Sequence, residues 1–250
     1  MERIHIKLAR GIAADVVVIG GGIIGVFTAY YLAKRGVSVV LVEKGRIGAE
    51  QSSRNWGWCR QQGRDMGELP IMMESLRLWK SLAQEFGTDL GFRQEGVLYL
   101  AKTDSEMAGF ERWLADARPH GVETHMMTAG AVAEKLKGSV KGWQGGIHTP
   151  SDARAEPWMA VPTLVQGAIT RGAVVVEHCA VRSLDLAAGR IAGVITEQGR
   201  IACDQVVLAG GAWSALFARA HGVALPQLAV KATVMATAPL PEVFAGNAAD

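Results

Sequence analysis

The stretch DVVVIGGGIIGVFTAYYLAKRGVSVVLVE, residues 15–43, decides how this chain folds. An apolar run at residues 16–19 leads directly into the glycine-rich sequence GGGIIG at residues 20–25. A helical stretch, a second apolar run at residues 37–42 and the acid Glu43 follow. This order of strand, glycine turn, helix, strand and acid is typical of a dinucleotide-binding βαβ unit.

Each part of the glycine turn has a physical role in that interpretation. Gly20 permits the tight turn out of the first strand, and Gly22 lets a pyrophosphate approach the backbone because it has no Cβ. Gly25 allows the helix to pack closely on the strand. The helix N-terminus, with the backbone N–H groups of Ile23 and Ile24, offers a partial positive charge to the pyrophosphate.

Glu43 is expected to accept hydrogen bonds from ribose hydroxyls, and its charge repels a 2′-phosphate. This favours FAD or NAD over NADP. The alternative is a glycine-rich turn in an ordinary α/β protein. The agreement of both strands, the helix and an acid about 20 residues on favours the nucleotide site.

Composition limits the function classes. A chain of 250 residues with 49% hydrophobic residues is long enough for one large or two small domains with a sizeable core. The net charge of +2 gives no reason to expect a nucleic-acid partner. Cys59, Cys179 and Cys203 lack metal-ligand spacing, so we expect no metal site, reduced thiols and a cytoplasmic location.

The N-terminus superficially resembles a signal peptide or membrane span, because basic residues in 1–15 precede an apolar stretch. Consecutive glycines at 20–22 interrupt any spanning helix, and Asp15 stands where the apolar region should begin. We therefore predict no targeting segment and no transmembrane helix; peripheral membrane association stays compatible with the sequence.

Beyond Glu43, residues 44–67 are polar and predict a loop. Residues 69–86 predict a helix, whose apolar stripe at helical spacing we interpret as core: Leu69, Met72, Met73, Leu76, Trp79 and Leu82. Helices are also predicted at 105–118, 129–137, 157–171 and from about 212 to 221, strands at 96–101, 173–177, 190–197, 200–203, 205–209 and 230–236, and a glycine-rich loop or short strand at 142–150. The nucleotide domain is predicted to be discontinuous, with residues 1–67 and 151–220, and a second domain to hold residues 68–150 and 221–250.

Four segments carry a resemblance to a known family: residues 16–44, the pair Ser52-Ser53 before Gly57, residues 155–184, and residues 204–214. In this combination the chain resembles the D-amino-acid oxidase-like flavoproteins, which include glycine and sarcosine oxidases and D-amino-acid dehydrogenases. The resemblance implies an α/β fold: a discontinuous Rossmann-type FAD-binding domain and an incomplete α+β substrate domain with an antiparallel sheet.

The resemblance also implies cofactor contacts for FAD. The glycine turn would hold the pyrophosphate, Glu43 the ribose, and Lys44 would flank the adenine. The remaining implied contacts are Ser52 and Ser53 to phosphate or flavin, Val181 to adenine through its backbone, and Gly210 and Gly211 passing close to the cofactor. A core valine is the alternative for Val181, and a helix N-cap for Ser52 and Ser53.

Family members are usually longer, and this chain resembles their first two-thirds. It is therefore interpreted as a truncated product, a gene fragment, or a subunit whose partner supplies the rest. The reaction implied is oxidation of the C–N bond of a D-amino acid or an N-substituted amino acid, with hydride transfer to flavin N5.

The resemblance makes Arg60 the first candidate for a substrate-side residue, because it lies a few residues after Ser52-Ser53, where some sarcosine-oxidase-like members place basic residues above the flavin. A guanidinium there would hold the substrate carboxylate; a solvated loop arginine is the alternative. Arg54 and Arg64 are weaker candidates. Other residues are assigned structural roles. Trp56 and Trp58 are interpreted as packing under a loop, with walls of the flavin pocket as the alternative. Cys59 is interpreted as an idle thiol rather than a covalent flavin link, and His148 and Lys231 as surface or satisfied residues in predicted strands.

Two other functions compete. An NAD-dependent dehydrogenase predicts a continuous run of βα units after Glu43, against which the polar loop and the later short strands argue. The third possibility is a flavin-binding remnant without activity of its own.

Overall fold

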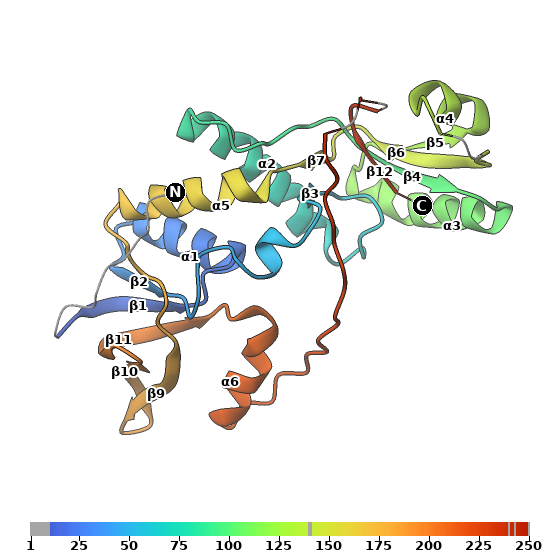
Figure 1. Ribbon diagram of the computed structural model, residues 1–250. Helices are drawn as coiled ribbons and strands as arrows, with labels where there is room; N and C mark the ends of the chain where they lie inside the picture. Colours follow the sequence, from blue (N-terminus) through green and yellow to red (C-terminus); the bar gives the residue numbers. More distant parts are fainter. Residues whose placement is uncertain (1–10, 140–141, 240, 243, 250) are drawn as a thin grey trace. The chain divides into compact units, whose positions relative to one another are not determined.

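The computed structural model describes residues 11–139, 142–239, 241–242 and 244–249 (Figure 1). The chain forms two compact units, each built from two separate stretches. The first unit comprises Met1–Asn55 and Pro157–Val234, and the second comprises Trp56–Glu156 and Met235–Asp250. The predicted domain boundaries lie elsewhere and stay a prediction. Residues 1–10, on which the prediction about a targeting segment partly rests, lie outside the described residues.

The first unit is organised around a six-stranded sheet in the order β8-β2-β1-β11-β10-β9. Neighbouring strands from β8 to β11 pair in parallel, and β10 pairs antiparallel with both β11 and β9. The strands are β1 (Ala13–Ile19), β2 (Val39–Val42), β8 (Val174–Val176), β9 (Val181–Ala187), β10 (Arg190–Thr196) and β11 (Gly199–Leu208).

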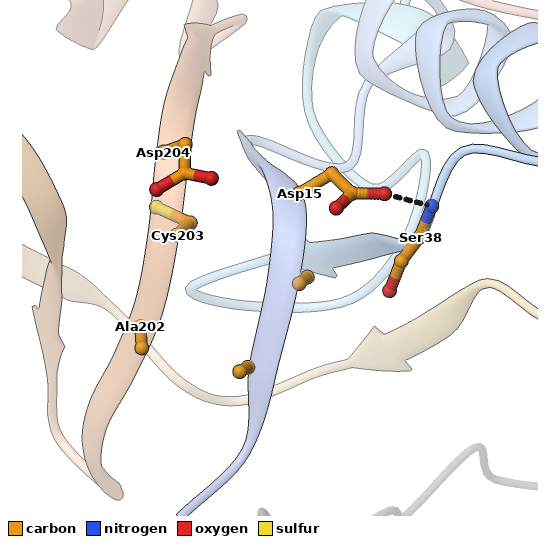
Figure 2. Close-up of a pocket in the computed structure, with 7 residues that line it drawn as sticks. Asp15, Ser38, Ala202, Cys203 and Asp204 are labelled. Carbon is orange, nitrogen blue, oxygen red and sulfur yellow. Dashed lines mark hydrogen bonds between the residues drawn. The ribbon is translucent and has the colours of Figure 1, made fainter.

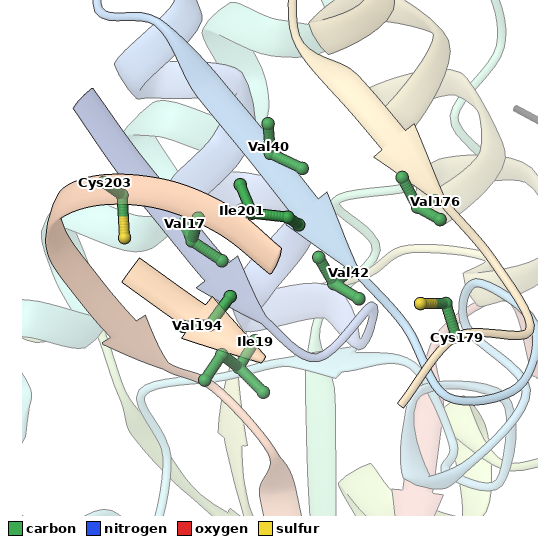
Figure 3. Close-up of a cluster of buried hydrophobic side chains, with 9 residues drawn as sticks. All are labelled: Val17, Ile19, Val40, Val42, Val176, Cys179, Val194, Ile201 and Cys203. Atoms are coloured by element: carbon green, nitrogen blue, oxygen red, sulfur yellow. The ribbon is translucent and has the colours of Figure 1, made fainter. Parts of the chain in front are cut away.

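Helices α1 (Ile23–Lys34) and α5 (Pro157–Ile169) pack against each other over β1, β2 and β8 (Figure 1). Val18 points toward α1, where it approaches Gly25, so the alternating residues Val17 and Ile19 point to the other face. On that face they belong to a buried hydrophobic cluster, to which the antiparallel strands β10 and β11 also contribute side chains (Figure 3). The other members of the cluster are Val40, Val42, Val176, Cys179, Val194, Ile201 and Cys203.

Strand β11 is one continuous strand, so the prediction of separate strands at 200–203 and 205–209 was wrong. Its first half pairs antiparallel with β10 and its second half pairs parallel with β1. The polar residue Asp204 lies in the strand without interrupting it. Short elements complete the unit: η1 (Gln51–Ser53), η3 (Gly211–Trp213) and α6 (Ser214–Ala220).

The second unit contains a four-stranded sheet in the order β12-β4-β6-β5, and β3 pairs with β7 beside it. Its antiparallel core consists of β4 and β6, with β5 on the far side of β6. The elements are β3 (Trp58–Cys59), α2 (Leu69–Phe86), β4 (Val97–Ala101), α3 (Asp104–Ala117), η2 (Arg118–His120), β5 (His125–Thr128), α4 (Ala129–Lys135), β6 (Gly145–Thr149), β7 (Ala153–Arg154) and β12 (Asn247–Ala249).

The predicted α/β class with a Rossmann-type unit is confirmed. The sheet of the second unit is antiparallel across β4, β6 and β5, as predicted, but β12 pairs in parallel with β4 and makes it a mixed sheet. Helix α2 has the predicted bounds, and Leu69, Leu76, Trp79 and Leu82 of its stripe are buried. The later strands and helices do not continue as simple βα repeats after β2, which argues against the NAD-dehydrogenase alternative. Within the described residues, no helix combines the length and the apolar character that crossing a bilayer requires.

The predicted strand at residues 230–236 was wrong, because this segment has no regular structure and is exposed throughout. A strand needs a neighbour to receive its backbone hydrogen bonds. In the described part of the chain no strand pairs with residues 230–236. Lys231 is therefore an exposed residue of an irregular segment rather than a strand residue.

Candidate nucleotide-binding site

The carboxyl end of β1 is the point where the strand order of the sheet reverses. From β1 the chain moves to β2 and then to β8 on one side, whereas β11 returns to the opposite side of β1. In open α/β sheets, ligands bind outside the carboxyl ends of strands at such a switch point. The glycine turn at residues 20–25 begins there, one residue after β1 ends.

The glycines at both ends of the turn are required by close backbone contacts. Gly20 has a φ of +110°, and a Cβ added there would overlap the carbonyl oxygen of Ala209, which follows β11. A Cβ at Gly25 would overlap the carbonyl oxygen of Gly20. Gly20 therefore lets the turn pack closely against the end of β11. Gly25 lets α1 pack closely against the turn, which is the packing role predicted for it.

The start of α1 is capped by a residue from a distant loop. The side-chain oxygen Oγ of Ser52 accepts a hydrogen bond from the backbone N–H of Ile23 at 2.8 Å. A Cβ added at Gly22 would meet only this Ser52 oxygen, at 3.2 Å, so the backbone at Gly22 is otherwise open. Ser53 does not take part, because its hydroxyl bonds to the carbonyl of Glu50 at 3.1 Å.

Glu43 is buried beside the turn, and both of its carboxylate oxygens are engaged. Oε2 accepts the backbone N–H of Gly21 at 2.6 Å, and Oε1 accepts the N–H of Gly45 at 2.7 Å. The acid thus ties the end of β2 to the glycine turn. A carboxylate offers about four lone-pair positions, so each oxygen retains capacity for a ribose hydroxyl.

Other predicted cofactor residues lie around the same edge. Lys44 places its ammonium over the indole ring of Trp213. Gly210 lies two residues beyond the end of β11, and its Cα lies 3.2 Å from the position of a Cβ at Gly20. Gly211 has a φ of +54° and open space where a side chain would be. Val181 begins β9 and packs half-buried against the core cluster, which is the environment of a core valine.

Two further residues at this edge were not predicted from the sequence. Glu177, which follows β8, accepts the backbone N–H of Ile47 at 2.7 Å and so anchors the loop after β2. Trp213 lies in one of the segments that carry the family resemblance, residues 204–214, but no individual role was predicted for it. The partner of Glu177 lies 130 residues away in sequence, so no local pattern indicates the contact.

Arg60, the predicted substrate-side residue, lies in the second unit on an anchored loop. Its guanidinium carbon is 5.6 Å from the ring centre of Tyr99, and Nη1 donates to the carbonyl oxygen of Gln62. The buried Asp152 accepts the backbone N–H groups of Gln61 at 2.7 Å and Gln62 at 3.0 Å. Burial raises the pKa of the Asp152 carboxyl, against the opposing effect of these hydrogen bonds.

The weaker arginine candidates have other partners. Arg54 is exposed and pairs with Glu50 at 3.1 Å, and Nη1 of Arg64 lies 3.6 Å from Glu68. The buried Nε of Arg64 and Nε2 of Gln62 have no hydrogen-bond partner within the described residues.

Three structural assignments from the sequence can be checked. Trp56 is 64% exposed, so packing under a loop was wrong for it, whereas Trp58 is half-buried in β3. Burial raises the pKa of the Cys59 thiol to about 12, which agrees with an idle thiol. His148 was neither exposed nor satisfied: it is buried in β6, and its Nε2 has no partner among the described residues.

A hollow also lies at the opposite, amino-terminal edge of the first sheet (Figure 2). It is lined by the start of β1, by Ser38 and by the middle of β11, and it presents the carboxylates of Asp15 and Asp204. Asp15 accepts the backbone N–H of Ser38 at 2.9 Å. Two carboxylates repel a diphosphate, so this hollow is not a candidate for the nucleotide.

Comparison with known proteins assigns the chain to a family. Residues 15–249 match the family described as FAD dependent oxidoreductase, abbreviated DAO. The chain belongs to this family. Its members are FAD-dependent, so the cofactor implied by the resemblance is confirmed at the level of the family.

This FAD dependent oxidoreductase is similar to two proteins that are named after sarcosine as their substrate. It is 31% identical to mitochondrial sarcosine dehydrogenase of Mus musculus, over 87% of this chain and 24% of that protein. It is also 31% identical to sarcosine oxidase subunit beta of Rhizobium meliloti (strain 1021), over 85% of this chain and 53% of that protein. The chain thus spans between a quarter and about half of the length of these relatives.

Among solved structures, the oxidoreductase is similar to L-amino acid deaminase from Proteus myxofaciens. The TM-score is 0.84 at 31% identity, and the match covers 90% of this chain and 51% of that one. The fold described above is therefore shared with an L-amino acid deaminase of known structure.

The residues at the carboxyl end of β1 fit FAD in three respects. The open backbone at Gly22 leaves room that a Cβ would fill. The N–H groups of Gly22 and Ile24 donate to no acceptor within the described residues, so they are free to bind a diphosphate. Glu43 lies beside these amides with acceptor capacity for a ribose.

Proposed function

We propose that this chain binds FAD at the carboxyl end of β1 and serves in the oxidation of the C–N bond of an amino acid or N-substituted amino acid. The observation that carries the proposal is the convergence of Gly22, Glu43 and Ser52 on the first turn of α1, at the switch point of the sheet. The names of the relatives, sarcosine dehydrogenase and L-amino acid deaminase, support the substrate class.

In this proposal each residue of the site has a separate task. The N–H groups of Gly22 and Ile24 bind the diphosphate, and Ser52 donates its hydroxyl proton to the same group while its oxygen accepts from Ile23. Glu43 accepts from the adenosine ribose. Gly210 and Gly211 leave the backbone free to pass close to the cofactor.

The substrate chemistry comes from the bound flavin, which supplies a hydride acceptor at N5. The chain itself positions the substrate. We assign the carboxylate-binding role to Arg60, whose guanidinium is oriented by Tyr99 and by the carbonyl of Gln62. An assay decides whether the substrate is a D-amino acid or an N-substituted amino acid such as sarcosine, as the resemblance implies, or an L-amino acid, as the name of one solved structure suggests.

The first experiment is an FAD titration of the purified protein. We expect absorption near about 450 nm that stays with the protein on gel filtration, and quenching of flavin fluorescence on binding. Activity is then measured with sarcosine, D-amino acids and L-amino acids in the presence of a dye acceptor. A protein that is purified without flavin absorption and does not bind added FAD contradicts the proposal.

A second function is favoured by one observation, the share of the relatives that the chain spans. In this alternative the chain is the flavin-binding part of an assembly and is active only with further polypeptide, and one relative is itself named a subunit. FAD binding without turnover of any tested amino acid supports it. The three free cysteines support the predicted cytoplasmic location, which fractionation would test.

A further inference from the structure

Lys44 and Trp213 meet across the candidate site. Lys44 lies two residues beyond the end of β2, and Trp213 ends the short helix η3 that follows β11. The ammonium nitrogen Nζ of Lys44 is 3.2 Å from the centre of the Trp213 ring, well within the range of a cation–π contact. Because β2 and β11 are the two neighbours of β1, this contact crosses the carboxyl end of β1.

Burial does not explain this contact, because both side chains are substantially exposed. Trp213 is 44% exposed and the Lys44 side chain is 42% exposed. Among the described residues, the ammonium also pairs with Glu50 at 3.8 Å, and Glu50 pairs with Arg54 as well. An exposed ion pair of this kind contributes little to stability. The aromatic ring is therefore the feature that fixes the position of the ammonium.

The charges around the glycine turn suggest a role for the Lys44 ammonium in binding a diphosphate. The carboxylate of Glu43 lies buried next to Gly21 and repels a diphosphate as well as accepting from a ribose. The turn itself offers only the partial positive charge of the α1 N-terminus. An ammonium held between the ends of β2 and β11 supplies a full positive charge at the edge of the sheet where the glycine turn begins.

We propose that Trp213 is a positioning residue that holds the Lys44 ammonium over the glycine turn, where it retains the diphosphate of the nucleotide. This inference rests on the proposed FAD site and deepens it. It assigns Lys44 to the diphosphate rather than to the adenine alone, and it adds Trp213, which acts through Lys44 and not by touching the nucleotide.

The test is a double-mutant cycle with Lys44→Met, Trp213→Leu and the combined variant, and with Trp213→Phe as the conservative change. Dissociation constants are measured for FAD, for ADP, which carries the diphosphate without the flavin, and for riboflavin, which lacks the diphosphate. Arg35→Met is the control, because it removes an equal charge from an exposed position at the other end of α1.

We expect Lys44→Met and Trp213→Leu each to weaken FAD and ADP about tenfold and to leave riboflavin unchanged. The combined variant should bind no more weakly than Lys44→Met, since Trp213 acts through the lysine. Trp213→Phe should retain most of the affinity, and both single variants should show a weaker dependence of ADP affinity on salt. Arg35→Met should match the wild type.

Three results overturn the inference. Additive losses would mean that Trp213 contacts the nucleotide itself. Tighter binding in either single variant would mean that the pair obstructs the site. An unchanged salt dependence would mean that Lys44 does not face the diphosphate. A wild-type protein that binds neither FAD nor ADP contradicts the proposed function itself, and the inference with it.

Discussion

The hydroxyl oxygen of Ser52 accepts the backbone N–H of Ile23 at 2.8 Å, and so caps a helix that begins 29 residues earlier in the chain. The residue that usually provides such a cap, the one directly before the helix, is Gly22, which has no side chain. In the proposed site a glycine at that position lets the nucleotide approach, and the cap comes instead from the loop after β2. One contact thus joins the stability of α1 to the geometry of the site.

Replacing Ser52 with alanine tests the structural half of this statement. Loss of an N-cap costs about 1 kcal/mol of the free energy of unfolding, and we expect that decrease in urea denaturation of Ser52→Ala without nucleotide. Ser53→Ala is the matched control, because the Ser53 hydroxyl makes only a local bond to the Glu50 carbonyl at 3.1 Å. Equal losses in the two variants would show that the cap does not stabilise α1.

Two glycine-to-alanine changes, which we expect to alter the free energy of unfolding in opposite directions, test the packing of α1 on the turn. Alanine in a helix interior is normally more stable than glycine by about 1 kcal/mol. We expect that gain for Gly109→Ala in α3, where the nearest side-chain atom lies 3.8 Å from the new methyl group. For Gly25→Ala the methyl overlaps the carbonyl of Gly20, and we expect a loss of about 2 kcal/mol or more. Denaturant midpoints of the two purified variants measure both; a gain for Gly25→Ala would contradict the packing described here.

An element of the fold could be predicted from the sequence when the residues that determine it lie close together in the chain. Helix α2 was predicted to the residue, because its apolar stripe keeps helical spacing and Gly87, with a left-handed φ of 58°, ends it. Strand β5 was missed, since its four residues His125–Thr128 carry no clear alternation. The strand predicted at residues 230–236 was wrong for the opposite reason, because the segment has a strand-like pattern but does not form a strand. Alternation records the preference of a segment for a strand but not the presence of a pairing neighbour.

The candidate site was predictable only in part for the same reason. The glycines and Glu43 lie within one βαβ unit, where spacing alone places them together. Contacts such as Ser52 with Ile23 and Glu177 with Ile47 depend on how distant loops fold over the sheet. Trp213 directly follows the Gly210-Gly211 pair, but only the order of the strands shows that it meets Lys44.

The open backbone at Gly22 yields a prediction about binding rather than stability. In the protein alone, a Cβ at this position meets only Ser52 Oγ at 3.2 Å, so Gly22→Ala should fold. A methyl group there occupies the space that a diphosphate needs, and we expect FAD to bind at least about tenfold more weakly. Gly109→Ala, which introduces the same group in the second unit, should leave FAD affinity unchanged. Affinity equal to that of the wild type in Gly22→Ala would place the diphosphate elsewhere.

His148 should make the stability of the second unit depend on pH. Burial lowers its pKa from 6.5 to about 4, and the positive charges of Lys135 and His125 act in the same direction. Between these values the unfolded chain binds a proton that the folded chain does not. Stability is therefore full above about pH 6.5 and falls as the pH drops toward about 4.

The variant His148→Gln removes the titrating group while keeping a polar side chain. We expect the difference in denaturant midpoint between about pH 7.5 and about pH 5 to be smaller in this variant than in the wild type. His120→Gln, at an exposed position, is the control and should behave as the wild type does. An equal loss of stability on acidification in His148→Gln and the wild type would mean that His148 binds its proton alike in the folded and unfolded chain, and that its burial in β6 does not exclude the charged form.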